Sequence, residues 1–321
     1  MKGRNPSEGR GQGFRKAILI NEHLVVYGVP AIAVPILLPV EVTATVGRGA
    51  GLRILVHPTT GGNPWKDTDS DRFEAVRRVL RTMGLSETEN MIQIQCGDDL
   101  PGWSGLGSSA AFCVALTRAL CKALSRFCPD EEINRIAYEG EKVFAANPSG
   151  IDNTVATHGQ TVWFERGRMP AWDRIRIGLP LWIVIGYSGI PARTRDEVEK
   201  VARFRDTHGG VFSGLVEEAT RLGRDARTAL ERGDGVSLGA LMDRGHAMLQ
   251  QLGVSNERLD EMIVFCRRQG ALGAKLTGGG GGGCMLALVS DQPEGETMVG
   301  GLERMGYPAL CVKLGRGEEP G

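Results

Sequence analysis

Two kinds of hydrophobic spacing alternate along the chain, and each predicts a different element. Unbroken apolar runs and apolar residues at every second position predict β-strands, because successive side chains of a strand point to opposite faces. In the N-terminal third, these strand patterns cover 17–20, 24–27, 40–46, 53–57 and 92–96. Apolar residues three or four positions apart over 73–83 predict a helix, which a capping pattern at Asp71 and Glu74 precedes and Gly84 follows.

Helical spacing dominates the remainder of the chain. From Ser109 onward, directly after the sequence GLGSS, one face is apolar at Cys113, Leu116, Leu120 and Leu124, which predicts a helix of about four turns. Three more helices are predicted over 215–230, 238–249 and 259–266, and three more strands over 182–187, 284–289 and 309–314. Strands and helices therefore occur on both sides of residue 178, which predicts an α+β fold with a domain boundary there.

The length of the chain supports a division into two domains. At 321 residues it exceeds the usual size of a single domain. Residues 1–14 are polar and rich in Gly and Arg, so we expect a flexible tail there. The N-terminal domain is then expected over 15–178 and the C-terminal domain over 179–321.

Charge and composition exclude several classes of partner. Lys plus Arg number 38, as do Asp plus Glu, so no net charge favours nucleic acid or an anionic membrane. The longest nearly uncharged apolar run, 31–40, contains two prolines and is far shorter than the roughly 20 residues of a membrane-spanning helix. The seven cysteines form no CxxC pair and lie mostly in apolar segments, so we expect buried thiols in a reducing, cytoplasmic compartment.

Glycine is about twice as frequent as in an average protein, with 46 residues, and it is clustered. The first cluster, GLGSSA at 105–110, separates a predicted strand from a predicted helix. Glycine lets a backbone approach a ligand closely, a helix N-terminus favours an anion, and Ser108 and Ser109 add hydroxyl groups. The segment lacks the GK[ST] of a Walker loop. It predicts an anion site, with a glycine turn and a serine N-cap as the structural alternative.

The second cluster is a run of six glycines, Gly278 to Gly283, directly before a predicted strand. Such a run is typical of a flexible linker, but here the flanking apolar segments leave no spacer. Ordering each glycine costs about 0.5–1 kcal/mol relative to Ala, so something must offset that loss. We favour a backbone that passes along phosphate groups, and a merely tolerated loop remains the alternative.

Two further segments place polar residues between apolar ones. KAILINEHLVVYGVP carries Asn21, Glu22 and His23, which need hydrogen-bond partners or a cleft. In EKVFAANPSGIDN, Glu141 ends a helical stretch and a Pro-Ser-Gly turn presents Asp152. Taken singly, His23 is compatible with a structural hydrogen bond and Asp152 with a turn-stabilising carboxylate.

Together the four segments resemble the GHMP kinase superfamily, and within it the mevalonate kinases, over residues 16–289. KAILINEHLVVYGVPAIAV resembles the first motif, PGWSGLGSSAA the ATP-phosphate loop, NPSGIDNTVATHG the segment of the catalytic aspartate, and KLTGGGGGGCMLAL the third motif. MDRGHAMLQQLGVSNERLD resembles the C-terminal half of mevalonate kinases. The resemblance implies a ribosomal protein S5 domain 2-like N-terminal domain and a ferredoxin-like C-terminal domain.

The resemblance also implies ATP and Mg²⁺ as cofactors. The nucleotide-binding residues that it implies are Gly105, Leu106, Gly107, Ser108, Ser109, Ala110, Gly278, Gly279, Gly280 and Gly281. Ser109 and Glu141 would hold Mg²⁺. Phosphoryl transfer depends mainly on positioning and electrostatics, so a site assembled from backbone amides, a metal ion and few side chains suits it.

For the acceptor alcohol, the resemblance implies a catalytic pair and a binding pocket. Asp152 would take the proton from the hydroxyl or orient it, and Lys16 would polarise that hydroxyl. Glu22, His23 and Thr194, the last in PARTRDEV, would line the pocket. The implied reaction converts mevalonate to 5-phosphomevalonate in isoprenoid biosynthesis, by a cytoplasmic enzyme that binds no nucleic acid or membrane. A homodimer is compatible with the resemblance.

The chain departs from the family pattern at a few positions. These are Asn21 for the usual Gly, Phe112 for Tyr, Gly279 for Ala, and Ala145-Ala146 for His-Gly. They concern the acceptor side rather than the nucleotide side, so another small alcohol or a sugar stays open as the acceptor. A nucleotide or metabolite sensor without activity is a further alternative. The adenine contacts are open as well, with 63–65 as a candidate.

Overall fold

The computed structural model describes residues 7–58, 70–98, 103–145, 147–178, 180–192 and 194–314. The chain forms two compact units. Unit 1 comprises Met1–Arg15, Leu38–Pro101 and Gly107–Gly159, and unit 2 comprises Lys16–Leu37, Gly102–Leu106 and Gln160–Gly321. These bounds differ from the single boundary predicted at residue 178. The reason is that two long N-terminal strands, β1 (Ser7–Ile20) and β2 (Ala31–Arg48), each contribute residues to both units.

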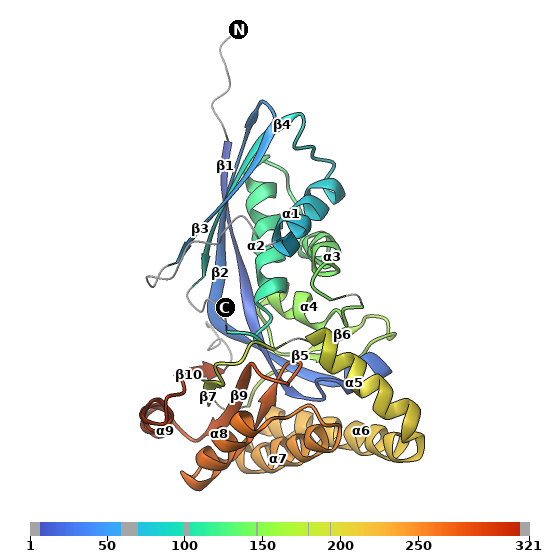
Figure 1. The fold of residues 1–321 in the computed structure, drawn as a ribbon, viewed down its shortest axis with the longest axis vertical. Helices are drawn as coiled ribbons and strands as arrows, with labels where there is room; N and C mark the ends of the chain where they lie inside the picture. Colours follow the sequence, from blue (N-terminus) through green and yellow to red (C-terminus); the bar gives the residue numbers. More distant parts are fainter. Residues whose placement is uncertain are drawn as a thin grey trace. The chain divides into compact units, whose positions relative to one another are not determined.

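Unit 1 is a sheet with helices against it. Strand β3 (Gly51–Pro58) runs parallel to β4 (Asn90–Asp98), which runs antiparallel to β2, and β1 also pairs with β2. The helices are α1 (Ser70–Thr82), α2 (Ser108–Ala123), α3 (Asp130–Glu141) and α4 (Ile151–His158). Figure 1 shows α1, α2 and α3 on one side of these strands, where they enclose the hydrophobic core. The predicted alternation over 40–46 and 92–96 and the helix over 113–124 are confirmed.

The first strand contains a stripe of glycines that packs on α2. Carbon atoms added as Cβ to Gly9, Gly11 and Gly13 would collide with the carbonyl oxygens of Ala119, Ala115 and Ala111, respectively. Two residues of a strand span about 6.8 Å and four residues of a helix about 6 Å. Every second residue of β1 can therefore contact every fourth residue of α2. The flexible tail expected over 1–14 is therefore wrong for residues 7–14, and residues 1–6 lie outside the described residues.

The C-terminal sheet of unit 2 consists of β7 (Leu181–Tyr187), β8 (Gly273–Thr277), β9 (Cys284–Val289) and β10 (Ala309–Leu314). The strands are ordered β10–β7–β9–β8, and all neighbours are antiparallel. In chain order this is fourth, first, third and second, which is the ferredoxin-like topology that the sequence resemblance implies. Buried residues occupy every position of β8 and β9, so this sheet is covered on both faces along these strands.

Five helices accompany this sheet: α5 (Thr194–Thr207), α6 (Gly209–Arg232), α7 (Gly235–Gln251), α8 (Glu257–Arg268) and α9 (Gln292–Arg304). Helices α7, α8 and α9 contact the sheet, α6 packs on α7, and α5 packs on α6. The helices that the structure describes all lack the length or the apolar character that a bilayer crossing needs.

Unit 2 also contains the first part of β2, which pairs with β5 (Val162–Phe164), and β5 pairs with β6 (Trp172–Arg174). The predicted strand over 24–27 is wrong, because Leu24–Tyr27 forms a 3-10 helix, η1. The amide of Val25 donates to the carbonyl of Asn21, and Gly28 ends the helix with φ 82°. Leu24 and Val25 are buried by tertiary contacts rather than by pairing in a sheet.

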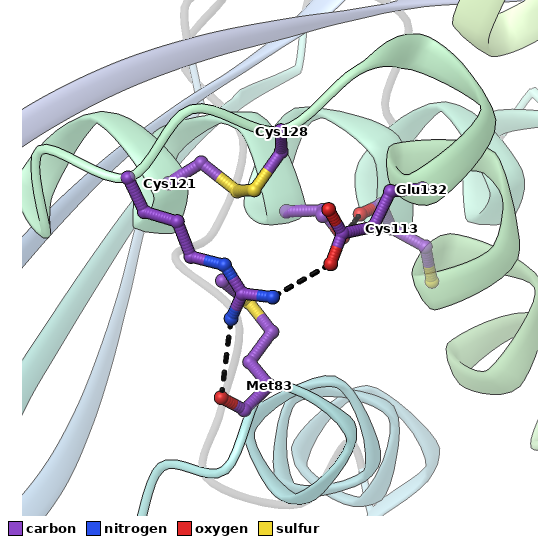
Figure 2. The surroundings of a disulfide bond; sticks show 7 residues. Met83, Cys113, Cys121, Cys128 and Glu132 are labelled. Atoms are coloured by element: carbon purple, nitrogen blue, oxygen red, sulfur yellow. Dashed lines mark hydrogen bonds and ion pairs between the residues drawn. A yellow bond between two sulfur atoms is a disulfide. The ribbon is translucent and has the colours of Figure 1, made fainter.

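One pair of cysteines is oxidised. Cys121 near the end of α2 and Cys128 before α3 form a disulfide, with Cα atoms 6.5 Å apart. Figure 2 shows this bond. The guanidinium of Arg126, in the turn between the two cysteines, donates to Glu132 and to the carbonyl of Met83. The expectation that all seven cysteines are reduced is therefore wrong for this pair, because the turn after α2 folds back and brings the two residues together. The other five cysteines keep their thiol groups.

Candidate active site

The first glycine segment forms the turn into α2. Gly105 and Gly107 have φ of 97° and 68°, and Gly107 is the N-cap residue of α2, which begins at Ser108. The strand, glycine turn and helix predicted from the sequence are thus confirmed in that order. The serine N-cap offered as the structural alternative is wrong, because the cap position is a glycine and both serines lie inside the first helical turn. Helix N-termini leave backbone N–H groups free to bind an anion.

Close helix packing places Glu141 beside the start of α2. Glu141 is the last residue of α3, and a Cβ on the preceding Gly140 would lie 2.9 Å from Sγ of Cys113 on α2. Burial, and then the negative charge of Glu141, raise the pKa of the Cys113 thiol. Since Cys113 follows Ser109 by one helical turn, Glu141 lies near the face of α2 that carries Ser109.

The turn that presents Asp152 is tied to α3. Gly150, with φ 93°, is the N-cap residue of α4, and Asp152 lies in the first turn of that helix. The hydroxyl of Tyr138 donates to the carbonyl of Pro148 at 3.1 Å, and Nδ2 of Asn153 donates to the side chain of Asn134. These bonds tie the turn and the first turn of α4 to α3, so the backbone around Asp152 is fixed. A negative side chain is also favoured at a helix N-terminus.

In unit 2, Lys16 lies against the first glycine turn. Its Nζ donates to the carbonyl of Gly105 at 3.2 Å, and its backbone amide donates to the carbonyl of Leu106 at 2.9 Å. The residue is 3% exposed. The side chain that is predicted to polarise the acceptor hydroxyl is therefore held next to the predicted phosphate loop.

Glu22 forms a buried ion pair that the sequence analysis did not identify. Nζ of Lys275 on β8 donates to Oε1 of Glu22, and both side chains are almost fully buried. Burial raises the pKa of Glu22 and lowers that of Lys275, while the charge of each partner opposes these shifts. Oε2 of Glu22 is buried without a hydrogen-bond partner among the described residues. The only signal in the sequence is a charged residue, Lys275, within an apolar stretch.

The six-glycine segment is a tightly packed turn between β8 and β9. At every one of its positions, a Cβ would collide with or press on a different neighbour. These neighbours are Gly105 for Gly278, Thr194 for Gly279, the carbonyl of Val254 for Gly280, the Glu197 carboxylate for Gly281, the carbonyl of Ile190 for Gly282 and the carbonyl of Ser104 for Gly283. This packing excludes a flexible linker, and the passage of this loop along phosphate groups stays a prediction. The two glycine segments of the sequence also meet, because the Cβ position of Gly278 lies 2.7 Å from Cα of Gly105.

Two predicted acceptor residues contact this turn. Nε2 of His23 lies 2.8 Å from the carbonyl oxygen of Gly279, and Thr194, at the start of α5, packs on the same glycine. Burial lowers the pKa of His23. Nε2 is the donor in this bond, because a carbonyl oxygen only accepts. Glu197 of α5 accepts from Lys200 at 2.7 Å. Its negative charge opposes the effect of burial, because it raises the pKa of His23.

The predicted site residues fall into one group in each unit. Unit 1 contains Gly107, Ser108, Ser109, Ala110, Glu141 and Asp152, and unit 2 contains Lys16, Glu22, His23, Gly105, Leu106, Thr194, Gly278, Gly279, Gly280 and Gly281. Within unit 2 the contacts described above join Lys16 to Gly105, Gly105 to Gly278 and His23 to Gly279. Ala146 and the adenine candidates at 63–65 lie outside the described residues.

Each half of the chain matches a known protein family. The family model described as GHMP kinases N terminal domain matches residues 72–160, and the model described as GHMP kinases C terminal matches 226–307. The mevalonate kinase of Aeropyrum pernix is 33% identical over 288 residues, which cover 86% of this chain and 87% of that protein. The mevalonate kinase of Pyrococcus abyssi is 33% identical over 292 residues, covering 85% and 86%.

Solved structures show the same similarity in three dimensions. The L. major mevalonate kinase, solved in complex with R-mevalonate, superposes with a TM-score of 0.86 and 30% identity, over 97% of this chain and 98% of that chain. The Lactococcus lactis galactokinase, solved with galactose, has a TM-score of 0.74 at 17% identity over 96% and 93%, so it shares the fold. The chain therefore belongs to the mevalonate kinase family of the GHMP kinases, whose members are ATP-dependent alcohol kinases.

Proposed function

We propose that this chain transfers the γ-phosphoryl group of ATP to the primary hydroxyl of mevalonate, which yields 5-phosphomevalonate and ADP. The observation that carries the proposal is the similarity, over 97% of the chain, to a kinase solved with R-mevalonate. Relatives of the same name at 33% identity support it.

In this reaction each of the predicted catalytic residues has one role. The acceptor oxygen forms a bond to the γ-phosphorus, the bond from that phosphorus to the β–γ bridging oxygen breaks, and ADP leaves. Asp152 accepts the proton of the hydroxyl, and Lys16 stabilises the negative charge that develops on the acceptor oxygen and the γ-phosphoryl group. The bonds that fix the turn before Asp152 support this role, because a base must be held in place to act.

The phosphates bind along the two glycine segments. Residues Gly105 to Ala110 supply the N-terminus of α2 and two hydroxyl groups, and Gly278 to Gly281 supply further backbone amides. The packing of every glycine in the second segment supports this assignment, since a preformed loop loses little entropy when it binds a ligand.

The residues of unit 1 fit a Mg²⁺ ion. A carboxylate and a hydroxyl, from Glu141 and Ser109, lie on neighbouring helices and are the hard oxygen donors that Mg²⁺ prefers. Magnesium sites in kinases need few protein ligands because substrate phosphates and water complete the coordination. When bound, the ion neutralises charge on the β- and γ-phosphates. Glu141 and Ser109 would hold it there.

The acceptor pocket is assigned to Glu22, His23 and Thr194. The contact of His23 and Thr194 with Gly279 supports a location beside the phosphate loop. The unengaged Oε2 of Glu22 supports a polar partner at that residue. We place the enzyme in the cytoplasm, where ATP is available. A homodimer is compatible with the same proposal, and light scattering would detect it.

An acceptor screen tests the proposed function. The purified full chain is given Mg-ATP with mevalonate, phosphomevalonate, homoserine or a simple sugar, and ADP release is measured by a coupled assay. We expect mevalonate to give the highest kcat/KM of the set. A higher kcat/KM for any other acceptor, or ADP release that mevalonate does not increase, would overturn the proposal.

A further inference from the structure

The residues Asn21, Glu22 and His23, here called the acceptor turn, begin with an unusual backbone conformation. Asn21 has φ 71°, one of only two non-glycine residues with positive φ among those that the structure describes. Asn tolerates this left-handed region better than most residues, but it is less favourable there than Gly. The conformation at Asn21 sets the direction in which the chain delivers Glu22 and His23.

The side chain of Asn21 ties this turn to helix α6. Its Nδ2 donates to the carbonyl oxygen of Pro30 at 2.7 Å and to that of Ala219 at 2.9 Å. The first bond closes the segment 21–30 on itself, and the second attaches it to α6. Both hydrogens of the amide are used, and the residue is buried.

A glycine on α6 makes room for this side chain. A Cβ on Gly223 would lie 3.1 Å from Nδ2 of Asn21 and 3.2 Å from the carbonyl oxygen of Pro30. Gly223 follows Ala219 by one helical turn, so it faces the same contact. Glycine inside a helix costs about 1 kcal/mol relative to Ala, which indicates a packing reason for its presence. Asn21 and Gly223 therefore fit each other.

Helices α5 and α6 hold the same segment at a second point. The ring of Tyr27 in η1 meets that of Phe212 edge to face, with centroids 5.0 Å apart, and Arg205 lies over Tyr27. The acceptor turn is thus anchored at Asn21 and again six residues later at Tyr27. His23 contacts the six-glycine turn at the carbonyl of Gly279, and the neighbours that the Cβ positions of that turn would meet lie outside residues 21–30.

We propose that Asn21 is a positioning residue, which sets the location of Glu22 and His23 through α6 and so determines the affinity for the acceptor but not for the nucleotide. The inference rests on the proposed function for the identity of the acceptor. A small displacement of Glu22 or His23 is enough to change the affinity for the acceptor strongly, because recognition depends on hydrogen-bond geometry. The Asn21 amide contributes no atom to the reaction itself.

The test uses Asn21→Gly, which permits the same backbone conformation and removes both hydrogen bonds. We expect KM for mevalonate to rise about tenfold, with kcat and KM for ATP within about twofold. An unchanged KM for mevalonate, or a parallel rise in KM for ATP, would overturn the inference.

A second variant changes the same contact on the side of helix α6. We expect Gly223→Ala to raise KM for mevalonate in the natural background and to have a smaller effect together with Asn21→Gly, since the nearest atom is then gone. Gly214→Ala is the matched control, because it lies on α6 with open space around its Cβ position. Equal effects of Gly223→Ala in both backgrounds would contradict the coupling.

An experiment without substrate separates this inference from the proposed function. Amide hydrogen exchange of residues 21–30 is expected to accelerate in Asn21→Gly, while exchange in β9 stays unchanged. Unchanged exchange over 21–30 overturns the inference. If the natural chain does not phosphorylate mevalonate, the proposed function fails, and KM is then measured with the acceptor that the screen identifies.

Discussion

Strand β1 in unit 1 and the six-glycine turn in unit 2 can be compared glycine by glycine. In β1, Gly9, Gly11 and Gly13 have ordinary extended backbone, and each faces a carbonyl of one helix, α2. In the turn, four of the six glycines have positive φ, and each of the six faces a different neighbour. The strand requires glycine only because glycine has no Cβ. The turn requires glycine for the same reason and also because glycine adopts a left-handed backbone without strain.

The largest expected effect concerns the strand. Gly11→Val places a branched side chain against the backbone of α2, which cannot move aside as a side chain would. We expect the free energy of unfolding to fall by about 4 kcal/mol, measured by urea denaturation. Gly97→Ala, at a glycine of β4 with no atom near its Cβ position, is the control and is expected to be neutral or slightly stabilising. Equal stability of the two variants would contradict the interpretation that β1 requires glycine because α2 leaves no room for a Cβ.

The next effect concerns the turn and separates the two properties of glycine. Gly280 combines φ 73° with a Cβ position blocked by the carbonyl of Val254, so Gly280→Ala is expected to lower kcat/KM for ATP about a hundredfold. At Gly279 φ is not positive, and a Cβ would lie 3.0 Å from Cα and Oγ1 of Thr194. For Gly279→Ala we expect a decrease of about threefold. The comparison fails if steady-state kinetics rank the two variants in the opposite order.

The smallest effect lies at the C-terminal end of α2, the helix on which β1 packs. The disulfide between Cys121 and Cys128 closes a short loop after α2, so its reduction is expected to lower the free energy of unfolding by about 2 kcal/mol. Thermal unfolding with and without a thiol reductant measures this. The double variant Cys121→Ser, Cys128→Ser should no longer respond to reductant. A natural chain equally indifferent to reductant would show that the bond does not contribute to stability.

The elements with strong hydrophobic periodicity were predictable from the sequence. The alternation of Val42, Ala44 and Val46 and the apolar face of α2 are local patterns, and the structure has a strand and a helix there. The strand β8 and helix α9 carry no such signal, because β8 contains Gly273 and Lys275 and α9 contains three glycines. The segment 24–27 is apolar but helical, since burial alone does not distinguish a strand from a 3-10 helix.

For the candidate site, motif spacing located the segments but not their partners. The contact of Gly105 with Gly278 is compatible with the assignment of both glycine segments to nucleotide binding. Lys275 binds Glu22 across 253 positions of sequence, and no local pattern encodes such a pairing. The same holds for the bond from Asn21 to Ala219, which joins residues 198 positions apart. Tertiary structure alone decides which buried polar groups satisfy each other.

The most direct test of the kinase account is the kcat of Asp152→Asn with mevalonate and Mg-ATP. Asp71→Asn is the matched control, because Asp71 is also an aspartate in the first turn of a helix of unit 1. The account predicts that kcat falls about a thousandfold in Asp152→Asn and stays within about twofold in Asp71→Asn. A kcat that Asp152→Asn retains, or that both variants lose equally, would contradict the role of Asp152 as the base.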